Sequence, residues 1–248
     1  MAIRAQLRGR MREGMWCTWM RCVASTNQQA LTWAQRNGRE GLVIVAEQQK
    51  RGRGRLGRRW ISLAGNVHCS MVLRPTREVA DYPQLSFLAG LALIDTLRSV
   101  RVCSRRYPLL ECKWPNDVLL GGRKVAGLLL EATRDAVVLG VGVNVCHAPK
   151  LARTTSLWHN GFLCRREQVI ERFCFFFWQR YKRWQSGQTR GDGIYREWMT
   201  HAYRLGCSIR VRLRDKVYSG TFLGVAEDGR LRLGSHQKER LIAAGDVT

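Results

Sequence analysis

The chain has 248 residues, of which 45% are hydrophobic, and it contains nine tryptophans. This length and apolar content suffice for one large domain, with or without a small second one, and they exclude a wholly disordered chain. A surplus of 42 basic over 19 acidic residues gives a net charge of +23, which favours partners such as nucleotides, nucleic acid, anionic lipid or an acidic protein without selecting among them.

The cysteines and the N-terminal segment bear on the cellular compartment. Nine cysteines are scattered along the chain without a C-x-x-C pair, which argues against a disulfide framework and a zinc site and predicts reduced, mostly buried thiols in a cytoplasmic protein. No apolar run approaches the roughly 20 residues that a membrane helix requires. Residues 1–16 are arginine-rich but lack the serines and the amphipathic period of a transit sequence, so we expect a basic extension.

The first predicted elements are a strand over residues 17–24 and a helix over 27–37. Ser25 or Thr26 is a suitable N-cap for this helix, and Gly38 is suited to close it in the C′ position. Capping accounts for both hydroxyl side chains. A helix N-terminus also leaves backbone N–H groups free for a ligand.

A buried strand is predicted at 42–46, and a strongly cationic segment follows at 50–59. Six of its ten residues are lysine or arginine and three are glycine, so we expect a loop that is mobile until a ligand supplies counter-charge. Its guanidinium groups suit a phosphate-bearing ligand, and an arginine–glycine contact with nucleic acid fits the composition about equally well. Trp60 could stack on a base, but a tryptophan at a strand start is more often core.

Two core elements come next. Alternation over 66–74 predicts a strand, in which His68 is more often structural than catalytic. Pro83 opens a helix that runs to about residue 100 and has an apolar face at helical spacing.

The segment 111–131 is predicted to form a β-hairpin that carries two lysines. The Gly-Gly pair at 121–122 supplies the positive φ of a two-residue turn. Lys113 and Lys124 lie in strands otherwise suited to a sheet core, where a lysine must be neutral, paired or facing a ligand. A single lysine is most simply placed at a strand end in water, but two of them beside Pro-Asn-Asp at 115–117 favour an anion site.

The remaining elements are a strand, two helices and a run of short strands. In the strand over 136–145, Gly140 and Gly142 leave room for a ligand or a backbone to come close. Helices are predicted at 165–186, where an aromatic face indicates core, and at about 193–203. From residue 206 onward, short strands at 209–213, 217–218, 221–225 and 231–233 alternate with turns, which suggests a small barrel.

Four blocks of this sequence resemble those of biotin–protein ligases, in that family's order and spacing. They are Ser25-Thr26-Asn27; Gly52-Arg53-Gly54-Arg55 through Gly57-Arg58-Arg59-Trp60; Lys113-Trp114-Pro115-Asn116-Asp117 with Gly122-Arg123-Lys124-Val125-Ala126-Gly127 and Leu128-Leu129-Leu130-Glu131; and Gly140-Val141-Gly142-Val143-Asn144. The resemblance covers roughly residues 20–248, and four ordered blocks are far more specific than a lone glycine–arginine loop.

The resemblance implies an α+β fold, with a mixed β-sheet flanked by helices over residues 1–204 (a class II synthetase-like biotin ligase catalytic domain) and a small SH3-like β-barrel over 205–248. It implies that biotin and ATP, with Mg²⁺, form biotinyl-5′-adenylate, whose biotin passes to a lysine of the biotin carboxyl carrier domain of an acyl-CoA carboxylase. No tightly bound cofactor or zinc is expected. The chain before Ser25 is too short for the winged helix-turn-helix of repressor members, so no specific DNA partner is expected. An exposed sheet edge is available for a homodimer.

Residue by residue, the resemblance also implies the site. Lys124 would act at the carboxylate and α-phosphate oxygens, and Lys113 in the same anionic cluster or on the incoming amine. The biotin-binding residues would be Ser25, Thr26, Asn27, Gln49, Gly127 and Leu129. The residues that bind the nucleotide or adenylate would be Arg53, Gly54, Arg55, Trp60, Asn116 and Asn144. Asp117 would help to place Mg²⁺, although an aspartate that caps a turn is the commoner case.

Two other functions stay open. A lipoate or octanoate ligase or transferase shares the sheet architecture and uses a lysine, but Lys113-Trp114-Pro115-Asn116-Asp117 favours biotin. A basic nucleic-acid-binding protein would account for the net charge and the arginine–glycine loop, and it would bind DNA or RNA without ATP and with a steep salt dependence. The positive charge is scattered through the whole chain, which disfavours the second function.

Overall fold

The computed structural model describes most of the chain. The described residues are 5–11, 14–36, 38–103, 107–189, 191–213, 216–235 and 238–248, without the side chains of 5–10. The predicted helix end at residue 37 and parts of the N-terminal extension and of the turn at 214–216 lie outside the described residues. Within the described ranges, no helix is long and apolar enough to cross a membrane.

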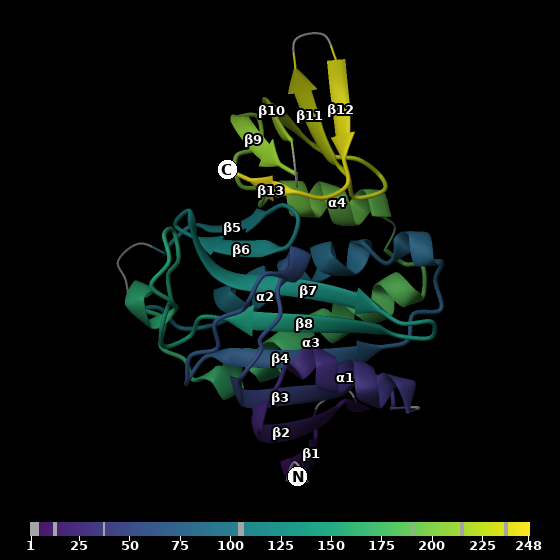
Figure 1. The fold of residues 1–248 in the computed structure, drawn as a ribbon, viewed down its shortest axis with the longest axis vertical. Coiled ribbons are helices and arrows are strands. Elements are labelled where there is room, and N and C mark those ends of the chain that lie inside the picture. The colour runs from purple at the N-terminus through teal and green to yellow at the C-terminus, as the bar shows by residue number, and fades with distance from the viewer. Residues whose placement is uncertain are drawn as a thin grey trace.

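An eight-stranded mixed sheet forms the centre of the larger domain (Figure 1). Its order is β1-β2-β3-β4-β8-β7-β6-β5, and of its neighbouring pairs only β2 and β3 are parallel. The strand bounds are β1 Ala5–Arg10, β2 Trp16–Val23, β3 Leu42–Gln49, β4 Val67–Leu73, β5 Leu110–Lys113, β6 Asp117–Leu120, β7 Arg123–Ala132 and β8 Val137–Val143. The mixed sheet predicted for an α+β fold is confirmed.

The sequence did not predict strand β1. It lies inside the segment expected to be only a basic extension, and it pairs antiparallel with β2 at the edge of the sheet. Its sequence, AQLRGR, alternates between non-polar and polar residues, but Leu7 is its one large apolar residue, so the strand signal is weak. Backbone pairing with an open strand edge needs no such pattern, because the hydrogen bonds come from main-chain groups.

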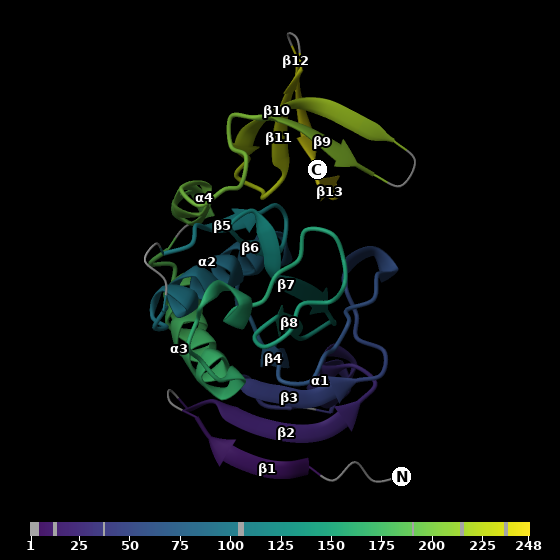
Figure 2. The same ribbon diagram turned by 90° about the vertical axis from the view of Figure 1, so that its left-hand side faces the viewer.

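Helices cover both faces of the sheet (Figure 2). Helix α1 (Thr26–Gln35) packs on β3, β4 and β8, whereas α2 (Gln84–Arg98) and α3 (Arg166–Gln185) lie on the other face, with α4 (Gly191–Met199) against α2. Helix α4 is the helix predicted at about 193–203, and it begins and ends a few residues earlier than predicted. The aromatic face of α3 is core as predicted, because Phe173, Phe177 and Trp184 are buried.

Helix α1 is fixed at both ends. Ser25 is its N-cap, and the Ser25 side chain accepts a hydrogen bond from the N–H of Gln28. At the other end, the N–H of Gly38 donates to the carbonyl of Trp33. Because the C-cap is Arg36, Gly38 occupies the C″ position and not the predicted C′ position. Arg74, at the end of β4, donates to the carbonyl oxygens of Ala34 and Gly38 at 2.9 and 3.0 Å. One of the many arginines thus serves as a structural cap.

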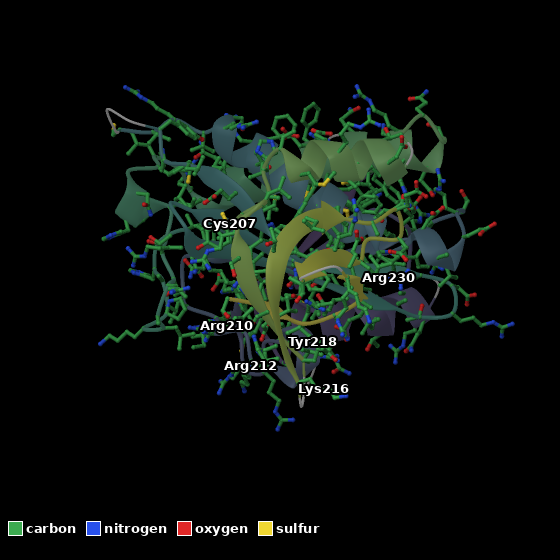
Figure 3. All side chains as sticks on the ribbon, turned by 90° about the horizontal axis from the view of Figure 1, so that it is seen from above. Cys207, Arg210, Arg212, Lys216, Tyr218 and Arg230 are labelled. Carbon is green, nitrogen blue, oxygen red and sulfur yellow. The ribbon has the colours of Figure 1, made fainter. Side chains whose placement is uncertain are left out.

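The C-terminal strands form a separate antiparallel sheet in the order β12-β11-β10-β9-β13. Their bounds are β9 Ser208–Arg212, β10 Val217–Val225, β11 Leu231–Ser235, β12 Lys238–Ile242 and β13 Asp246–Val247. The strands predicted at 217–218 and 221–225 are one strand, and β12 and β13 were not predicted. In Figure 3, which looks onto this sheet, Arg210 and Arg212 of β9 project on one side and Arg230 lies on another, so its cations are spread around it.

The two domains share a hydrophobic core. Buried residues of the C-terminal sheet, among them Phe222 and Leu231, belong to the same cluster as the residues of α2 and β6. The indole Nε1 of Trp114, in the turn between β5 and β6, donates to the carbonyl oxygen of Gly229 at 3.1 Å in a buried position. The C-terminal sheet is therefore held against the β5–β6 turn. The single hairpin predicted over 111–131 is three strands joined by two turns, with Lys113 on β5 and Lys124 on β7.

Candidate active site

A cavity of about 260 Å³ opens where α1, the arginine loop (residues 50–60) and strands β7 and β8 meet. This volume is close to the lower end of the range for small-molecule sites, about 300 Å³. Fourteen of the fifteen predicted site residues line it: Ser25, Thr26, Asn27, Gln49, Arg53, Gly54, Arg55, Trp60, Asn116, Asp117, Lys124, Gly127, Leu129 and Asn144. Segments from four distant parts of the sequence are thus brought into one cavity. The remaining residue is Lys113.

Polar groups gather at the N-terminus of α1. The N–H of Thr26 donates to Gln49 Oε1 at 2.8 Å, and Gln49 Nε2 donates to Ser62 Oγ at 3.0 Å. Thr26 and Asn27 are both buried, with 4% and 3% of their surfaces exposed. The end of β3 and the start of α1 are therefore joined into one rigid, hydrogen-bonding end of the cavity.

Two glycines of β8 admit side chains of the cavity wall. A Cβ atom on Gly140 would lie 2.1 Å from Asn27 Oδ1, and one on Gly142 would lie 2.5 Å from the ring of Trp60. Neither distance is possible for a real side chain, so any larger residue would displace Asn27 or Trp60. These glycines were predicted to leave room for a ligand or a backbone, whereas the groups that approach them are the side chains of Asn27 and Trp60.

A β-bulge determines where Lys124 points. Asp117 pairs with Gly127 and Val118 with Ala126, but Leu119 pairs with Lys124, so Val125 is an extra residue in β7. Without it, Lys124 would share the face of Val118, which is fully buried. Because facing residues alternate along a strand, the one-residue shift turns Lys124 onto the cavity face beside Asp117.

Lys124 is held in place by an ion pair. Its Nζ lies 2.6 Å from Asp117 Oδ1, with the two side chains 33% and 18% exposed. It also lies 5.7 Å from the centre of the Trp60 ring. A Cβ on Gly127 would come within 3.2 Å of the Lys124 side chain, so this glycine leaves room for the amine. The ammonium group is thus partly desolvated, oriented and adjacent to the space a ligand would occupy.

Lys113 lies next to this cavity without being one of its lining residues. It pairs with Asp117 across the β5–β6 hairpin, which puts both side chains on the same face of the sheet. Burial lowers the pKa of Lys113, Asp117 opposes this shift, and Lys124 and Arg153 lower the pKa further. The amine of Lys113 therefore interacts electrostatically with Lys124, but it lies at the margin of the cavity, and the role predicted for it stays a prediction.

The arginine loop is folded over the cavity, and its arginines contact three separate parts of the chain. Arg53 Nη2 lies 2.7 Å from Glu131 Oε1 in β7, and Arg55 Nη1 donates to Asn116 Oδ1 at 3.4 Å. Arg58 forms an ion pair with Asp246 of β13. Within the loop, the N–H of Gly54 donates to the carbonyl of Arg58 at 2.8 Å. The predicted mobility of a ligand-free loop stays a prediction.

Trp60 is oriented by a buried histidine. Its Nε1–H donates to His68 Nδ1 at 3.3 Å, and the other ring nitrogen of His68 lies 3.2 Å from the carbonyl oxygen of Leu63. Burial lowers the pKa of His68, which favours the neutral ring that can accept from Trp60 while donating to Leu63. His68 is thus structural, as predicted, because it fixes the indole that covers Gly142.

Asn144 presents an unused acceptor to the cavity. Its Nδ2 donates to the carbonyl of Thr155 at 3.1 Å, whereas its Oδ1 is the buried side-chain polar atom without a partner among the described residues. The turn that follows is fixed by Asn66, whose Oδ1 accepts from the N–H groups of Val145 and Cys146 at 2.9 and 3.0 Å. A buried carbonyl oxygen of this kind requires a donor, such as the N–H of a ligand.

The donor set does not fit a metal site held by the protein. Asp117 and Asp246 are the carboxylates that line the cavity, and they are paired with Lys124 and Arg58. No group of three or more histidine, cysteine, aspartate or glutamate side chains suited to a metal occurs among the described residues. The predicted contact of Asp117 with Mg²⁺ competes with its ion pair to Lys124.

Asp246, Ser70 and Glu131 are among the residues of the site that were not predicted to take part in it. Asp246 reaches the cavity from the C-terminal sheet, and neither its position in sequence nor a motif indicated this. Ser70 and Glu131 lie behind the lining, where Ser70 Oγ contacts Thr26 and Asn27, and Glu131 contacts Asn27 and Arg53. A faint signal was available for these two: each is a polar residue within or at the end of an otherwise apolar strand.

Comparison with known proteins agrees with the residues in the cavity. Residues 19–145 match the biotin/lipoate A/B protein ligase family, and residues 205–248 match the biotin protein ligase C-terminal domain. The chain is 36% identical over 239 residues to a biotin–acetyl-CoA-carboxylase ligase of Paracoccus denitrificans, covering 90% of this chain and 96% of that one. It is 33% identical over 219 residues to a ligase of the same name from Mycobacterium tuberculosis, covering 84% and 79%.

A solved structure shows the same fold. The biotin protein ligase from Aquifex aeolicus in complex with biotin and ATP superposes with a TM-score of 0.78 at 25% sequence identity, over 94% of this chain and 97% of that one.

Proposed function

The chain belongs to the biotin/lipoate A/B protein ligase family, and from this premise we propose that it is a biotin–protein ligase. It activates biotin with ATP to biotinyl-5′-adenylate and transfers biotin to a specific lysine of a biotin carboxyl carrier domain. The observation that carries this proposal is the single cavity, which is lined by the α1 N-terminus, Lys124, the arginine loop and the unpaired acceptor of Asn144.

The first step of this reaction brings two anions together. The carboxylate oxygen of biotin attacks the α-phosphorus of ATP, the P–O bond to pyrophosphate breaks, and pyrophosphate leaves. Repulsion between carboxylate and phosphate must be offset where charge accumulates, so the protein contributes mainly positioning and fixed positive charge. We assign this role to Lys124, with Arg53 and Arg55 on the loop and Lys113 at the margin. Arg55 suits it because its guanidinium group stays cationic although burial lowers its pKa.

The two ends of the cavity suit the two halves of the adenylate. Thr26, Gln49 and Ser25 offer hydrogen-bonding groups for the ring of biotin, and Gly127 and Leu129 would lie along its tail. At the other end, the free oxygen of Asn144 would accept from the exocyclic amine of adenine, with Trp60 and Asn116 nearby in the lining. The folded arginine loop would shield the mixed anhydride from water.

In the second step, a lysine amine of the acceptor attacks the mixed anhydride. The amine nitrogen forms an amide bond with the biotin carbonyl carbon, AMP leaves, and the amine proton is lost. Lys113 lies beside the cavity with a lowered pKa caused by burial, and its charge would favour the neutral form of an incoming amine. The acceptor that fits these requirements is the biotin carboxyl carrier domain. We also propose that the chain divides into a catalytic domain over residues 1–204 and a C-terminal domain over residues 205–248.

The deciding experiment is incubation with biotin and ATP. We expect the chain to retain biotinyl-5′-adenylate, identified by mass spectrometry, and to add one biotinyl group to a carrier domain in a second incubation. Lipoate and octanoate in place of biotin test the related transferases, and adenylate formation with either acid but not with biotin would overturn the proposal. A homodimer through an edge strand and the absence of a specific DNA partner stay predictions.

The contact between the arginine loop and the C-terminal sheet leads to a prediction on product retention. Asp246→Asn is expected to speed dissociation of biotinyl-5′-adenylate by about 1.4- to fivefold, because an exposed ion pair such as Arg58–Asp246 contributes about 0.2–1 kcal/mol. Stopped-flow tryptophan fluorescence would measure the rate. Asp192→Asn breaks an ion pair with Arg196 on α4 and serves as the control, for which no change is expected. Equal rates for both variants would show that Asp246 does not hold the loop.

A further inference from the structure

A chain of hydrogen bonds runs beneath the α1 end of the cavity. Ser70 Oγ lies 2.7 Å from Thr26 Oγ1 and 2.6 Å from Asn27 Oδ1. Asn27 Nδ2 lies 2.9 Å from Glu131 Oε2, and the other oxygen of Glu131 lies 2.7 Å from Arg53 Nη2. Thr26, Asn27 and Ser70 are at most 4% exposed. Their polar atoms therefore depend on one another for partners.

The orientation of the Asn27 amide is fixed by Glu131. One edge of the amide faces the Glu131 carboxylate at 2.9 Å and the carbonyl oxygen of Leu129 at 3.5 Å. Both groups only accept hydrogen bonds, so this edge must be the NH₂ group. The oxygen of the amide therefore faces Ser70.

Ser70 in turn fixes the direction of its hydrogen bond with Thr26. The Asn27 oxygen carries no proton, so the 2.6 Å contact is a hydrogen bond only if Ser70 donates. A hydroxyl group has one proton, so the 2.7 Å contact with Thr26 is satisfied only if the Thr26 hydroxyl donates to Ser70. Gln49 Oε1 accepts from the N–H of Thr26 and could also accept from the Thr26 hydroxyl, but at 3.1 Å it lies farther from that hydroxyl than Ser70 does. On either partner, the proton of the Thr26 hydroxyl is used within the protein. The Thr26 hydroxyl is left with a lone pair and no proton for a ligand.

The cavity wall thereby presents an acceptor beside donors. Gln49 Nε2 uses one of its two protons on Ser62 and keeps the second. Ser25 Oγ accepts from the N–H of Gln28, which leaves its own proton free. A cyclic urea has an N–H donor next to a carbonyl acceptor, so it is complementary to a Thr26 acceptor flanked by these donors. An ester or a plain hydrocarbon chain is not.

We propose that Ser70 and Glu131 are specificity-determining positioning residues that set the direction of hydrogen bonding at Thr26. They select a ring N–H of the ligand without touching it, since neither lines the cavity. This inference rests on the proposed function, with biotin as the ligand. Glu131 also anchors Arg53 of the loop, but Ser70 does not, so Ser70 variants report on the hydrogen-bond direction alone.

The test compares biotin with its two cyclic carbamate analogues, in each of which one ring N–H is replaced by oxygen. Isothermal titration calorimetry without ATP measures all three affinities. In the wild-type chain, one carbamate is expected to bind about 100-fold more weakly than biotin, because its ring oxygen faces an acceptor and both stay unsatisfied. In Ser70→Ala, the Thr26 hydroxyl can turn its proton towards the ligand, and this discrimination is expected to fall below about tenfold.

A second variant and two controls complete the design. Glu131→Gln can present an NH₂ group to Asn27 and let the amide flip, so the same loss of discrimination is expected. Ser70→Cys preserves volume but donates only weakly, which covers the case in which Ser70→Ala does not fold. Ser86→Ala removes a hydroxyl of α2 that donates to Pro115 at 3.2 Å and should leave the discrimination unchanged. Dethiobiotin, which keeps both ring N–H groups, should keep its affinity ratio to biotin in every variant.

The outcomes separate the inference from the function on which it rests. Equal weakening of biotin and both carbamates in the Ser70 and Glu131 variants would show a merely structural role and overturn the inference, while the biotin ligase proposal would stand. A wild-type chain that does not bind biotin would refute the proposed function instead. Loss of discrimination in Glu131→Gln with none in the Ser70 variants would assign the effect to Arg53 and also overturn the inference.

Discussion

Lys124→Ala is expected to lower biotin-dependent pyrophosphate exchange by about 100- to 1,000-fold, the range measured when one group that stabilises transition-state charge is removed. The truncation has two consequences. It removes the cation assigned to the carboxylate and α-phosphate oxygens. It also removes the ion-pair partner 2.6 Å from the Asp117 carboxylate, which is then left with the more distant charges of Lys113 and Arg55. The fold should be retained, because the amine is one-third exposed and outside the core.

Two companion variants separate these consequences. Lys124→Ala combined with Asp117→Asn also removes the Asp117 charge. Any activity recovered by the double variant therefore measures repulsion by Asp117, and the remaining deficit measures the missing amine. Lys238→Ala, at an exposed position in β12, controls for loss of a lysine elsewhere and should exchange normally. Circular dichroism verifies the fold. Exchange within about threefold of wild type in the single variant would contradict the role assigned to Lys124.

Gly140→Ala is expected to weaken biotin binding by about 10- to 100-fold. The added Cβ would lie 2.1 Å from Asn27 Oδ1, and overpacking of a tightly filled site costs about 1–3 kcal/mol, which corresponds to this range. The Asn27 side chain cannot rotate away cheaply, because its hydrogen bonds to Ser70 and Glu131 hold it on both sides. Calorimetric titration with biotin measures the effect.

The matched control is Gly193→Ala, in helix α4. A Cβ there meets no atom within 4 Å, so biotin affinity should be unchanged, and the stability of the chain should rise by up to about 1 kcal/mol because alanine has the higher helix propensity. Thermal unfolding of both variants separates a local effect at the site from general destabilisation. Unchanged biotin affinity in Gly140→Ala would mean that Asn27 is not part of the binding end of the cavity.

The basic character of the chain has more than one structural use. Arg74 caps α1 through carbonyl oxygens, and Arg180 joins α3 to Asp95 of α2 and to Glu197 of α4. The loop arginines Arg53 and Arg58 are paired with carboxylates at the cavity. Part of the surplus charge therefore serves the fold and the site, which weakens the nucleic-acid interpretation that rested on net charge.

Local sequence determined which elements form and which residues could carry chemistry. Alternating strands, the helix starting at Ser25, the Gly-Gly turn and the ordered motif blocks all depend on neighbours in sequence, and the structure places fourteen of the fifteen predicted residues around one cavity. The predictions of elements succeeded because capping, turn formation and amphipathic periodicity act over a few residues. The site residues were named from the resemblance to biotin–protein ligases, and their roles stay predictions. The strands β1 and β12 were missed because their sequences are rich in charged residues and contain few large apolar ones.

Only the tertiary structure decided which side chains meet and in which direction. The extra residue Val125 turns Lys124 to the cavity, and this register exists only once β6 and β7 pair. Asp246 reaches Arg58 from 188 residues away, and the direction of the bond at Thr26 follows from Ser70 and Glu131 on two other strands. Register and long-range polar pairing are set by the packing of whole elements, so no local pattern in the chain encodes them.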